Sequence, residues 1–259
     1  MPAADLPLLI EAARAAGEVA LRYSGETARQ WEKPEGLGPV TEADLAVNEV
    51  LHDMLRAGRP DYGWLSEETE DGPARLETRR AFIIDPIDGT RSFIEGSGTW
   101  AHSLAVVEDG IPTAAVVYLP ARDMLYAAAA GEGATRNGAP IRATPRRELA
   151  GASVLAAKPG YQPQHWRDGA VPDVTRVYRP SLAYRLSIVA EGRFDAMFTL
   201  RPTWEWDVAA GDLILREAGA ATSDRAGRPL RFNNPHPQVE GVVAANPALH
   251  AQITGALAY

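Results

Sequence analysis

The residues best placed for chemistry are two aspartates that follow a predicted strand. An apolar run over residues 81–84 predicts a buried strand, which delivers Asp85 to a turn fixed by Pro86. Asp88 follows shortly after. The two carboxylates are close enough in the chain to reach one hard cation, since Mg²⁺ prefers carboxylate and carbonyl oxygens. The segment therefore predicts a magnesium site, and an ordinary Asp-Gly turn with Asp88 as a helix cap is the structural alternative.

The two residues after Asp88 favour the binding of an anion beside that cation. Gly89 lets the backbone approach a ligand closely. Thr90 can start a short helix over residues 91–95, whose free N–H groups attract negative charge. The pattern thus predicts a cation site and an anion site side by side.

Three further acids lie at the ends of other predicted elements. Glu67 follows a strand predicted over residues 62–66, where it is either a metal ligand or part of a solvated acidic loop. Asp207 begins a helix predicted over 207–218, either as a ligand or as an acid favoured at a helix N-terminus. Asp44 completes a capping-box pattern, so a purely structural role is equally open to it. Function often collects at such element ends.

The composition narrows the kind of site. The chain has no cysteine and its five histidines lack ligand spacing, so the acids indicate oxygen-ligated Mg²⁺ rather than zinc. A formal net charge of −8 argues against a nucleic-acid partner, because phosphate contacts need clustered Lys and Arg. No apolar run reaches the roughly 20 residues of a membrane span, and no signal peptide is evident. We therefore expect a cytoplasmic protein without membrane contact.

Hydrophobic periodicity predicts a hairpin-rich first half and a second half that alternates strands and helices. We expect residues 1–144 to form an N-terminal α+β half with an antiparallel sheet and most metal ligands. Residues 145–259 should form a C-terminal α/β half that supplies Asp207 and the substrate contacts. A loop rich in Gly and Pro is expected over 33–39. The predicted helices cover 6–23, 41–56, 182–191, 207–218 and 247–257. The remaining predicted strands cover 100–108, 113–119, 124–129, 174–178, 194–200 and 239–244, with another near 154.

Four segments together resemble the inositol monophosphatase family. The family pattern runs Val-Thr-x-x-Asp, a Glu-Glu after a strand, Asp-Pro-Ile/Leu-Asp-Gly-Thr, and Trp-Asp-x-Ala-Ala/Gly-Gly. The chain matches this pattern in order at residues 40–44, 66–69, 85–90 and 206–211. The resemblance spans nearly the whole chain. It implies an α/β (α+β) fold, a layered αβαβα sandwich, and the activity of a Mg²⁺-dependent, lithium-sensitive phosphomonoesterase.

The resemblance also implies metal-binding roles for the matching residues. Glu67, Asp85 and the carbonyl of Ile87 would bind a first Mg²⁺. Asp85, Asp88 and Asp207 would bind a second, with Asp85 bridging the two ions. A third, weaker ion near Glu67 is typical of the family. Such cations would neutralise an anionic phosphate ester and generate the nucleophile.

The remaining implied roles concern the attacking water and the phosphate. Thr90 with Glu67 and Asp44 would orient and deprotonate the water, and the backbone N–H groups of Gly89 and Thr90 would hold the phosphate. Water would then displace the alcohol in line, without a covalent enzyme intermediate.

The substrate is predicted from the second half of the chain. Inositol monophosphatases carry a Glu shortly before the Trp-Asp aspartate, whereas residues 198–203 contain no acid. Residues 202–207 instead resemble a motif of bacterial 3'(2'),5'-bisphosphate nucleotidases, so hydrolysis of adenosine 3',5'-bisphosphate to AMP is the leading prediction. Residues 91–94 are more similar to histidinol-phosphatase members. Inositol-1-monophosphatase and histidinol-phosphatase remain alternatives, and a non-catalytic regulator that binds a phosphometabolite is less favoured because every ligand is present.

Four basic residues are the expected contacts to a small phosphorylated metabolite. Lys33 and Lys158 are the only lysines of a chain that otherwise uses arginine, and Lys33 suggests a need for a compact point charge. Lys158, Arg185 and Arg201 either bind a second phosphate or are surface charges. A homodimer is also expected, since dimers are common among relatives of the family.

Overall fold

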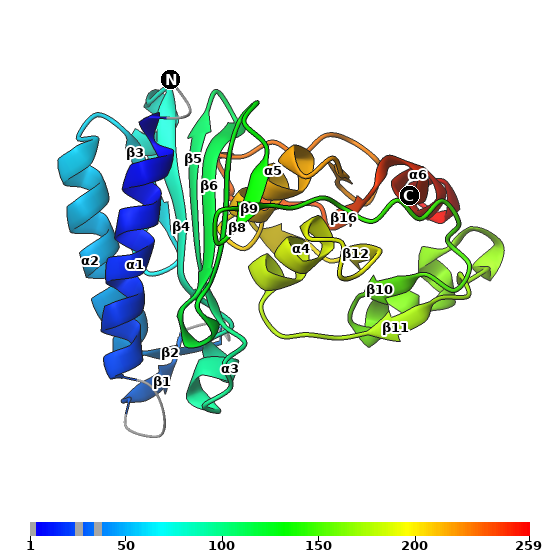
Figure 1. Cartoon of the computed structure of the whole chain (residues 1–259), viewed down its shortest axis with the longest axis horizontal. Helices are drawn as coiled ribbons and strands as arrows, with labels where there is room; N and C mark the ends of the chain where they lie inside the picture. Colours follow the sequence, from blue (N-terminus) through cyan, green and yellow to red (C-terminus); the bar gives the residue numbers. More distant parts are fainter. Residues whose placement is uncertain (1–3, 24–27, 34–37) are drawn as a thin grey trace.

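Five layers of helices and sheets make up the protein (Figure 1). The computed structural model describes residues 4–23, 28–33 and 38–259. The helices are α1 (Leu6–Arg22), α2 (Glu42–Gly58), α3 (Thr90–Ile94), α4 (Leu182–Ala190), α5 (Ala209–Glu217) and α6 (Pro247–Ala256). From one side to the other, the layers are α1 with α2, a seven-stranded sheet, α4 with α5, a five-stranded sheet, and α6. The predicted αβαβα sandwich is confirmed.

The seven-stranded sheet has the order β3-β4-β5-β6-β7-β8-β9. Its strands are β3 (Gly63–Ser66), β4 (Arg80–Asp88), β5 (Ala101–Glu108), β6 (Ile111–Leu119), β7 (Met124–Ala129), β8 (Ala134–Arg136) and β9 (Ala139–Pro140). β3 is parallel to β4, and the other neighbours are antiparallel. Because side chains alternate along a strand, Phe82 and Ile84 pack toward α1 and α2, whereas Ile83 packs toward α4 and α5. Asp85 follows on the face of Ile83.

Helices α1 and α2 cover one face of this sheet because each has an apolar stripe at helical spacing. The stripe of α1 runs from Leu9 to Ala20 and is fully buried. At the start of α2, Thr41 and Asp44 form a reciprocal capping box, in which each side chain bonds the backbone N–H of the other residue. The helices predicted over 6–23 and 41–56 are confirmed with small shifts at their ends.

The five-stranded sheet has the order β11-β10-β12-β16-β14. Its strands are β10 (Ser153–Leu155), β11 (Thr175–Val177), β12 (Ala196–Thr199), β14 (Ala221–Ser223) and β16 (Val242–Ala245). β10 is parallel to β11 and β12, while β16 is antiparallel to β12 and β14. Two small sheets pair β1 (Gln30–Glu32) with β2 (Pro39–Thr41) and β13 (Thr203–Trp204) with β15 (Gln238–Val239).

The central layer joins the two sheets through one continuous apolar core. Residues from both large sheets pack against α4 and α5 in this core. The two helices approach closely at Gly211, where a Cβ atom would lie 2.5 Å from Leu186 Cδ1 and 2.6 Å from Leu186 Cβ. Only glycine therefore fits at the end of the segment 206–211. The division of the chain at residue 144 stays an expectation.

Three local predictions differ from the structure. β4 does not end at Asp85 but continues to Asp88 through a register shift. The helix expected to begin at Asp207 begins at Ala209, so Asp207 lies in the preceding turn. The strand expected over 239–244 is split into β15 and β16 around Gly241, whose φ of 80° breaks the extended backbone. The loop expected over 33–39 lies partly outside the described residues.

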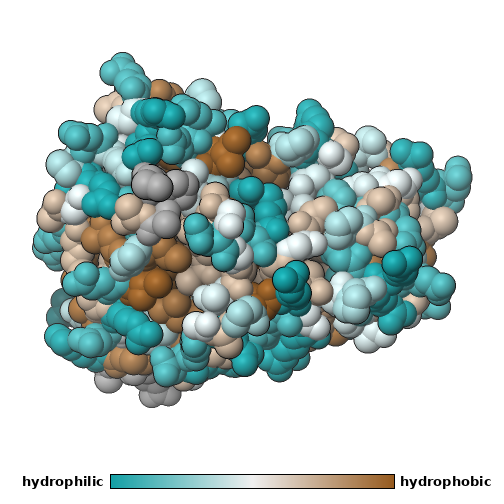
Figure 2. Space-filling model, turned by 45° about the horizontal axis from the view of Figure 1, so that its top comes forward, coloured by the Kyte–Doolittle hydropathy of each residue, from teal (hydrophilic) through white to brown (hydrophobic). Residues whose placement is uncertain are grey.

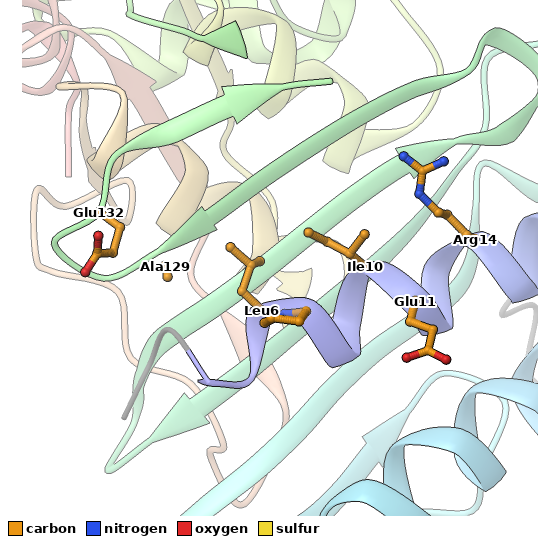
Figure 3. Close-up of a pocket in the computed structure, with 7 residues that line it drawn as sticks. Leu6, Ile10, Glu11, Arg14, Ala129 and Glu132 are labelled. Carbon is orange, nitrogen blue, oxygen red and sulfur yellow. The ribbon is translucent and has the colours of Figure 1, made fainter. Parts of the chain in front are cut away.

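The surface is mostly hydrophilic in the view of Figure 2, with hydrophobic residues gathered in a few smaller areas. A pocket of about 660 Å³ lies between the start of α1 and the β7–β8 hairpin (Figure 3). Leu6 and Ile10 form much of its apolar wall, and Glu11, Arg14 and Glu132 stand at its edge. None of the described helices combines the length and apolarity that crossing a membrane requires.

The close contact between α4 and α5 predicts that Gly211→Ala destabilises the protein. The added methyl group overlaps Leu186 in a filled core, so we expect the free energy of unfolding to fall by about 1–3 kcal/mol in urea denaturation. Gly255→Ala is the matched control because Gly255 is exposed on α6 with nothing within 4 Å of the added carbon. That control should keep or gain up to about 1 kcal/mol. Equal effects of the two changes would contradict the packing argument.

Candidate active site

Three aspartates meet at the edge of the central layer. Asp85 lies near the end of β4, Asp88 is its last residue, and Asp207 lies in the turn before α5. Each of the three carboxylates offers an oxygen within 4.8 Å of the others. Asp85 and Asp88 are buried, at 1% and 7% exposure. The structure therefore gathers three of the predicted metal ligands around one point.

A β-bulge explains how Asp85 and Asp88 come to face the same side. In a regular strand, residues three apart point to opposite faces. Here Asp85 pairs with Ser103 and Asp88 with Ala101, so two residues of β4 stand opposite the single residue His102. The extra residue returns Asp88 to the face of Asp85. Pro86 fits there because a bulge does not require its missing N–H.

Asp88 is held by the start of α4. Its Oδ2 accepts hydrogen bonds from Ser181 Oγ at 2.6 Å and from the Ala183 N–H at 2.6 Å. Ser181 caps α4, and its backbone has φ 61° and ψ 116°, a conformation that costs a non-glycine residue about 1–3 kcal/mol. Such strain persists only where surrounding contacts hold it. Ser181 was not among the predicted site residues, although a serine directly before an apolar helical run is a signal for a helix cap.

The electrostatics of the three carboxylates call for a cation. Burial raises the pKa of Asp85 well above its usual range, and the charges of Glu67, Asp88 and Asp207 raise it further. The pKa of Asp207 is raised for the same reasons, burial first and then Asp88. Asp85 Oδ1 is buried without a hydrogen-bond partner among the described residues. An orphaned carboxylate oxygen beside two further carboxylates fits a divalent cation with oxygen ligands.

Burial also raises the pKa of Asp88, although the hydrogen bonds from Ser181 and Ala183 oppose that shift. Of the three acids, Asp88 thus has direct support for its charged form from neutral donors. A charged ligand that is fixed by other contacts presents its free oxygen to a metal in a defined direction.

Glu67 lies beside the cluster in an ion pair. Lys33 Nζ is 2.8 Å from Glu67 Oε1 and 2.6 Å from Glu68 Oε1, and all three side chains are largely buried. Burial and the neighbouring charge of Glu67 raise the pKa of Glu68 to about 7. Burial lowers the pKa of Lys33, but the two glutamates outweigh it and the net shift is upward. The structure thus pairs Lys33 with the acids and leaves its predicted contact to a substrate untested.

Thr90 connects Asp44 with the backbone between Asp85 and Asp88. Its Oγ1 lies 3.2 Å from Asp44 Oδ1 and 3.1 Å from the carbonyl oxygen of Ile87. Since the hydroxyl proton is donated to one of these acceptors, the oxygen lone pairs remain to accept a hydrogen bond from water. Burial raises the pKa of Asp44 to about 6, against the lowering effect of its bonds from Thr41. Asp44 therefore combines the predicted capping role with a contact to a predicted catalytic residue.

His102 of β5 lies opposite the bulge in β4 and supports it. It is fully buried, and its Nδ1 bonds the carbonyl oxygen of Pro86 across the bulge. Burial lowers the pKa of His102 to about 4, so the ring is neutral near pH 7. Its Nε2 has no partner among the described residues. His102 is one of the five histidines without ligand spacing, and nothing in the sequence around it indicates that it faces Pro86.

A cleft of about 440 Å³ opens over these residues. Its lining includes the predicted residues Glu67, Asp88, Gly89, Thr90, Arg185, Arg201 and Asp207. Lys158 is exposed in a short 3₁₀ turn and does not belong to the described lining. The ring of Tyr178 lies 5.6 Å from the guanidinium carbon of Arg185. Burial lowers the pKa of Arg185. The charges of Asp88 and Asp207 raise it in part, and the nearby charge of Arg201 lowers it further. Two guanidinium groups therefore share one cleft with the acidic cluster.

The fold and its acidic cleft are those of a phosphatase. The structure of an IMPase of Thermotoga maritima has a TM-score of 0.81 to this chain at 28% sequence identity, covering 98% of this chain and 96% of the other. The chain belongs to the inositol monophosphatase family, whose family model matches residues 4–258. Similar curated proteins include a histidinol-phosphatase of Chlorobaculum parvum, 32% identical over 98% of this chain and 96% of its own. A Nus factor SuhB of Xylella fastidiosa is 33% identical over 92% of this chain and 89% of its own.

The neutral, buried ring of His102 predicts a contribution to stability that depends on pH. With a pKa of about 4 in the folded protein and 6.5 as its ordinary value, His102 binds a proton only in the unfolded chain between these pH values. Stability from this residue is therefore complete above pH 6.5 and is lost as the pH falls toward 4, by about 3 kcal/mol at most.

We expect the stability difference between wild type and His102→Gln to shrink over that pH range. Urea unfolding at saturating Mg²⁺ between pH 7 and pH 4 measures it. His52→Gln, at an exposed histidine of α2, is the matched control. Parallel curves for His102→Gln would show that the ring is not held neutral.

Proposed function

We propose that this phosphatase is a Mg²⁺-dependent 3'(2'),5'-bisphosphate nucleotidase that converts adenosine 3',5'-bisphosphate to AMP. The observation that carries the proposal is the presence of Arg185 and Arg201 in the cleft that also contains Asp88 and Asp207. The acidic cluster suits a cation that binds one phosphate. The two guanidinium groups suit a second anionic group, since Arg binds phosphate oxygens with parallel N–H donors.

The charge of the cleft separates this substrate from the two alternatives. An inositol monophosphate has no second anionic group to compensate two neighbouring guanidinium charges. Histidinol phosphate carries a cationic amine, which Arg185 and Arg201 would repel at short range. The relative that is named a histidinol-phosphatase keeps that activity as the second candidate. A comparison of kcat/KM on the three substrates distinguishes the candidates.

Each group of the chain has a proposed task in the reaction. Asp85, Asp88 and Asp207, with Glu67 and the Ile87 carbonyl, would hold two Mg²⁺ ions, and Glu67 would also bind a third ion weakly. Bound Mg²⁺ supplies positive charge against the phosphate oxygens and acidity for water.

The other proposed tasks belong to the residues beside the metal ligands. Thr90 orients the water through its free lone pairs, and Asp44 fixes the Thr90 hydroxyl and assists Glu67 in accepting the proton. The backbone N–H groups of Gly89 and Thr90 hold the transferred phosphate.

We further propose that lithium inhibits the enzyme, and that it acts in the cytoplasm as a homodimer without a nucleic-acid partner. The relatives named Nus factor SuhB keep open a regulatory role. The complete acidic cluster supports catalysis instead, because a silent binding protein does not need three carboxylates around one point.

Asp88→Asn tests the metal site. The amide keeps the shape of the side chain and can still contact Ser181, but it removes one negative charge from the cluster. We expect kcat to fall at least about a hundredfold, and Mg²⁺ binding measured by calorimetry to weaken. Asp53→Asn, at an exposed residue of α2, is the control with the same chemical change and should alter neither quantity. Unchanged turnover in Asp88→Asn, or full activity in excess chelator, would refute the metal-dependent mechanism.

Arg201→Ala tests the second anion site. Arg201 is exposed, so its removal leaves the core intact. We expect kcat/KM for adenosine 3',5'-bisphosphate to fall about tenfold, the scale of one lost charge-assisted hydrogen bond. Adenosine 3'-monophosphate, which lacks the second phosphate, should be affected much less. Arg22→Ala, at an exposed arginine of α1, serves as the control. An equal loss on both substrates would argue against a second phosphate at Arg201.

A further inference from the structure

A second pocket of about 450 Å³ adjoins the catalytic cleft. The two share Ala157, Thr199 and Arg201 in their walls, so these residues form the boundary between them. The cleft is lined mainly by polar and charged groups, whereas the second pocket is largely apolar. We name the second pocket the side pocket. Its remaining lining is Pro159, Gly160, His165, Phe198, Leu200, Arg225 and Tyr259.

The wall of the side pocket is fixed by contacts on every side. Phe198 is 1% exposed, and its ring meets those of Tyr161 and Trp166 edge to face at 5.2 and 5.5 Å. A Cβ atom on Gly160 would lie 2.8 Å from the Phe198 ring, so only glycine allows the chain this approach. Leu200, the neighbour of Arg201, adds an apolar side chain that is 5% exposed. A preformed apolar wall binds a ligand at little cost in conformational entropy.

Tyr259 closes the outer side of the side pocket while remaining 47% exposed. Its ring stacks on His165 at 5.9 Å, and its hydroxyl bonds His165 Nδ1. The guanidinium carbon of Arg225 lies 4.8 Å from the centre of the Tyr259 ring. Arg225 is itself fixed by bonds to the Leu200 carbonyl at 2.8 Å and to Glu240 at 2.6 Å. The half-exposed tyrosine is therefore held in place over an apolar space rather than packed into the core.

We propose that the side pocket binds a planar, largely apolar ring of the substrate, such as a nucleobase, while the phosphates lie in the catalytic cleft. Continuity through Ala157, Thr199 and Arg201 supports this occupant, because one molecule can reach both spaces. Arg201 at the boundary suits an anionic group next to the ring. A polyhydroxylated ring would leave its hydroxyls unpaired against Phe198 and Leu200. The inference rests on the proposed function in that the cleft takes phosphate esters.

The test compares two substrates that differ only in the ring: adenosine 3',5'-bisphosphate and 1-deoxyribose 3,5-bisphosphate, which has no base. We expect kcat/KM at saturating Mg²⁺ to be at least about tenfold higher with the base, the scale of one ring contact. Tyr259→Ala should raise KM for the adenosine substrate about tenfold with little change in kcat, and should leave the base-free substrate unchanged. Tyr259→Phe should keep most of the preference. Leu45→Ala, at a similarly exposed hydrophobic residue of α2, is the control.

Equal kcat/KM on the two substrates, or a preference that survives Tyr259→Ala, would overturn the inference. A monomer–dimer equilibrium that Tyr259→Ala shifts in analytical ultracentrifugation would overturn it too, because a second copy would then cover the side pocket. Absence of phosphate release from both substrates would refute the proposed function alone. In that case calorimetry with AMP decides: binding about tenfold weaker in Tyr259→Ala than in wild type supports the side pocket, and equal binding overturns it.

Discussion

The repulsion among three clustered carboxylates, two of them buried, is the constraint on which the rest of the site depends. Asp85, Asp88 and Asp207 lie within 4.8 Å of one another, where desolvation and like charge both oppose ionisation. A protein that keeps such a cluster must hold it with rigid elements, because the carboxylates would otherwise move apart. β4 holds two of them and the turn before α5 the third, and both elements belong to the central core. A cation bound between the carboxylates would offset their repulsion, and the same three charges would attract that cation.

The groups around the carboxylates are arranged to keep this geometry and to leave the cation side open. His102 supports the bulge from behind, and Ser181 holds Asp88 from α4 at the cost of a strained backbone. Lys33 compensates the glutamates at the outer side, and Thr90 connects the turn to Asp44. Catalytic power in such sites comes from groups that are already in position, since no reorganisation is then needed during the reaction.

The carboxylates of this site can be predicted from the sequence, whereas the residues that hold them in place cannot. Asp85, Asp88 and Asp207 are predicted as metal ligands because they lie at the ends of predicted elements. The order of the four family segments then favours metal binding over helix capping. Asp207 was expected as the first residue of a helix, and it lies two residues before α5, where its side chain contacts Asp85. Ser181 and His102 contact residues that are 93 and 16 positions away, so local spacing carries no trace of these contacts. Periodicity predicts most of the helices and strands and the family resemblance implies the five layers, whereas the bulge in β4 arises from pairing with β5.

The attachment of Asp88 to α4 fixes the distance from the carboxylate cluster to other residues of this helix. Ser181 and Ala183 fix the start of the helix to a metal-binding carboxylate, and Arg185 follows one turn after Ser181. The separation between the cation cluster and that guanidinium is therefore set by a helical turn, with a rise of about 5.4 Å, rather than by a flexible loop. In the proposed substrate complex, one anionic group binds at the cation and the other at Arg185, so the cleft fits molecules whose two anionic groups have that spacing. It would select phosphate esters by length as well as by charge.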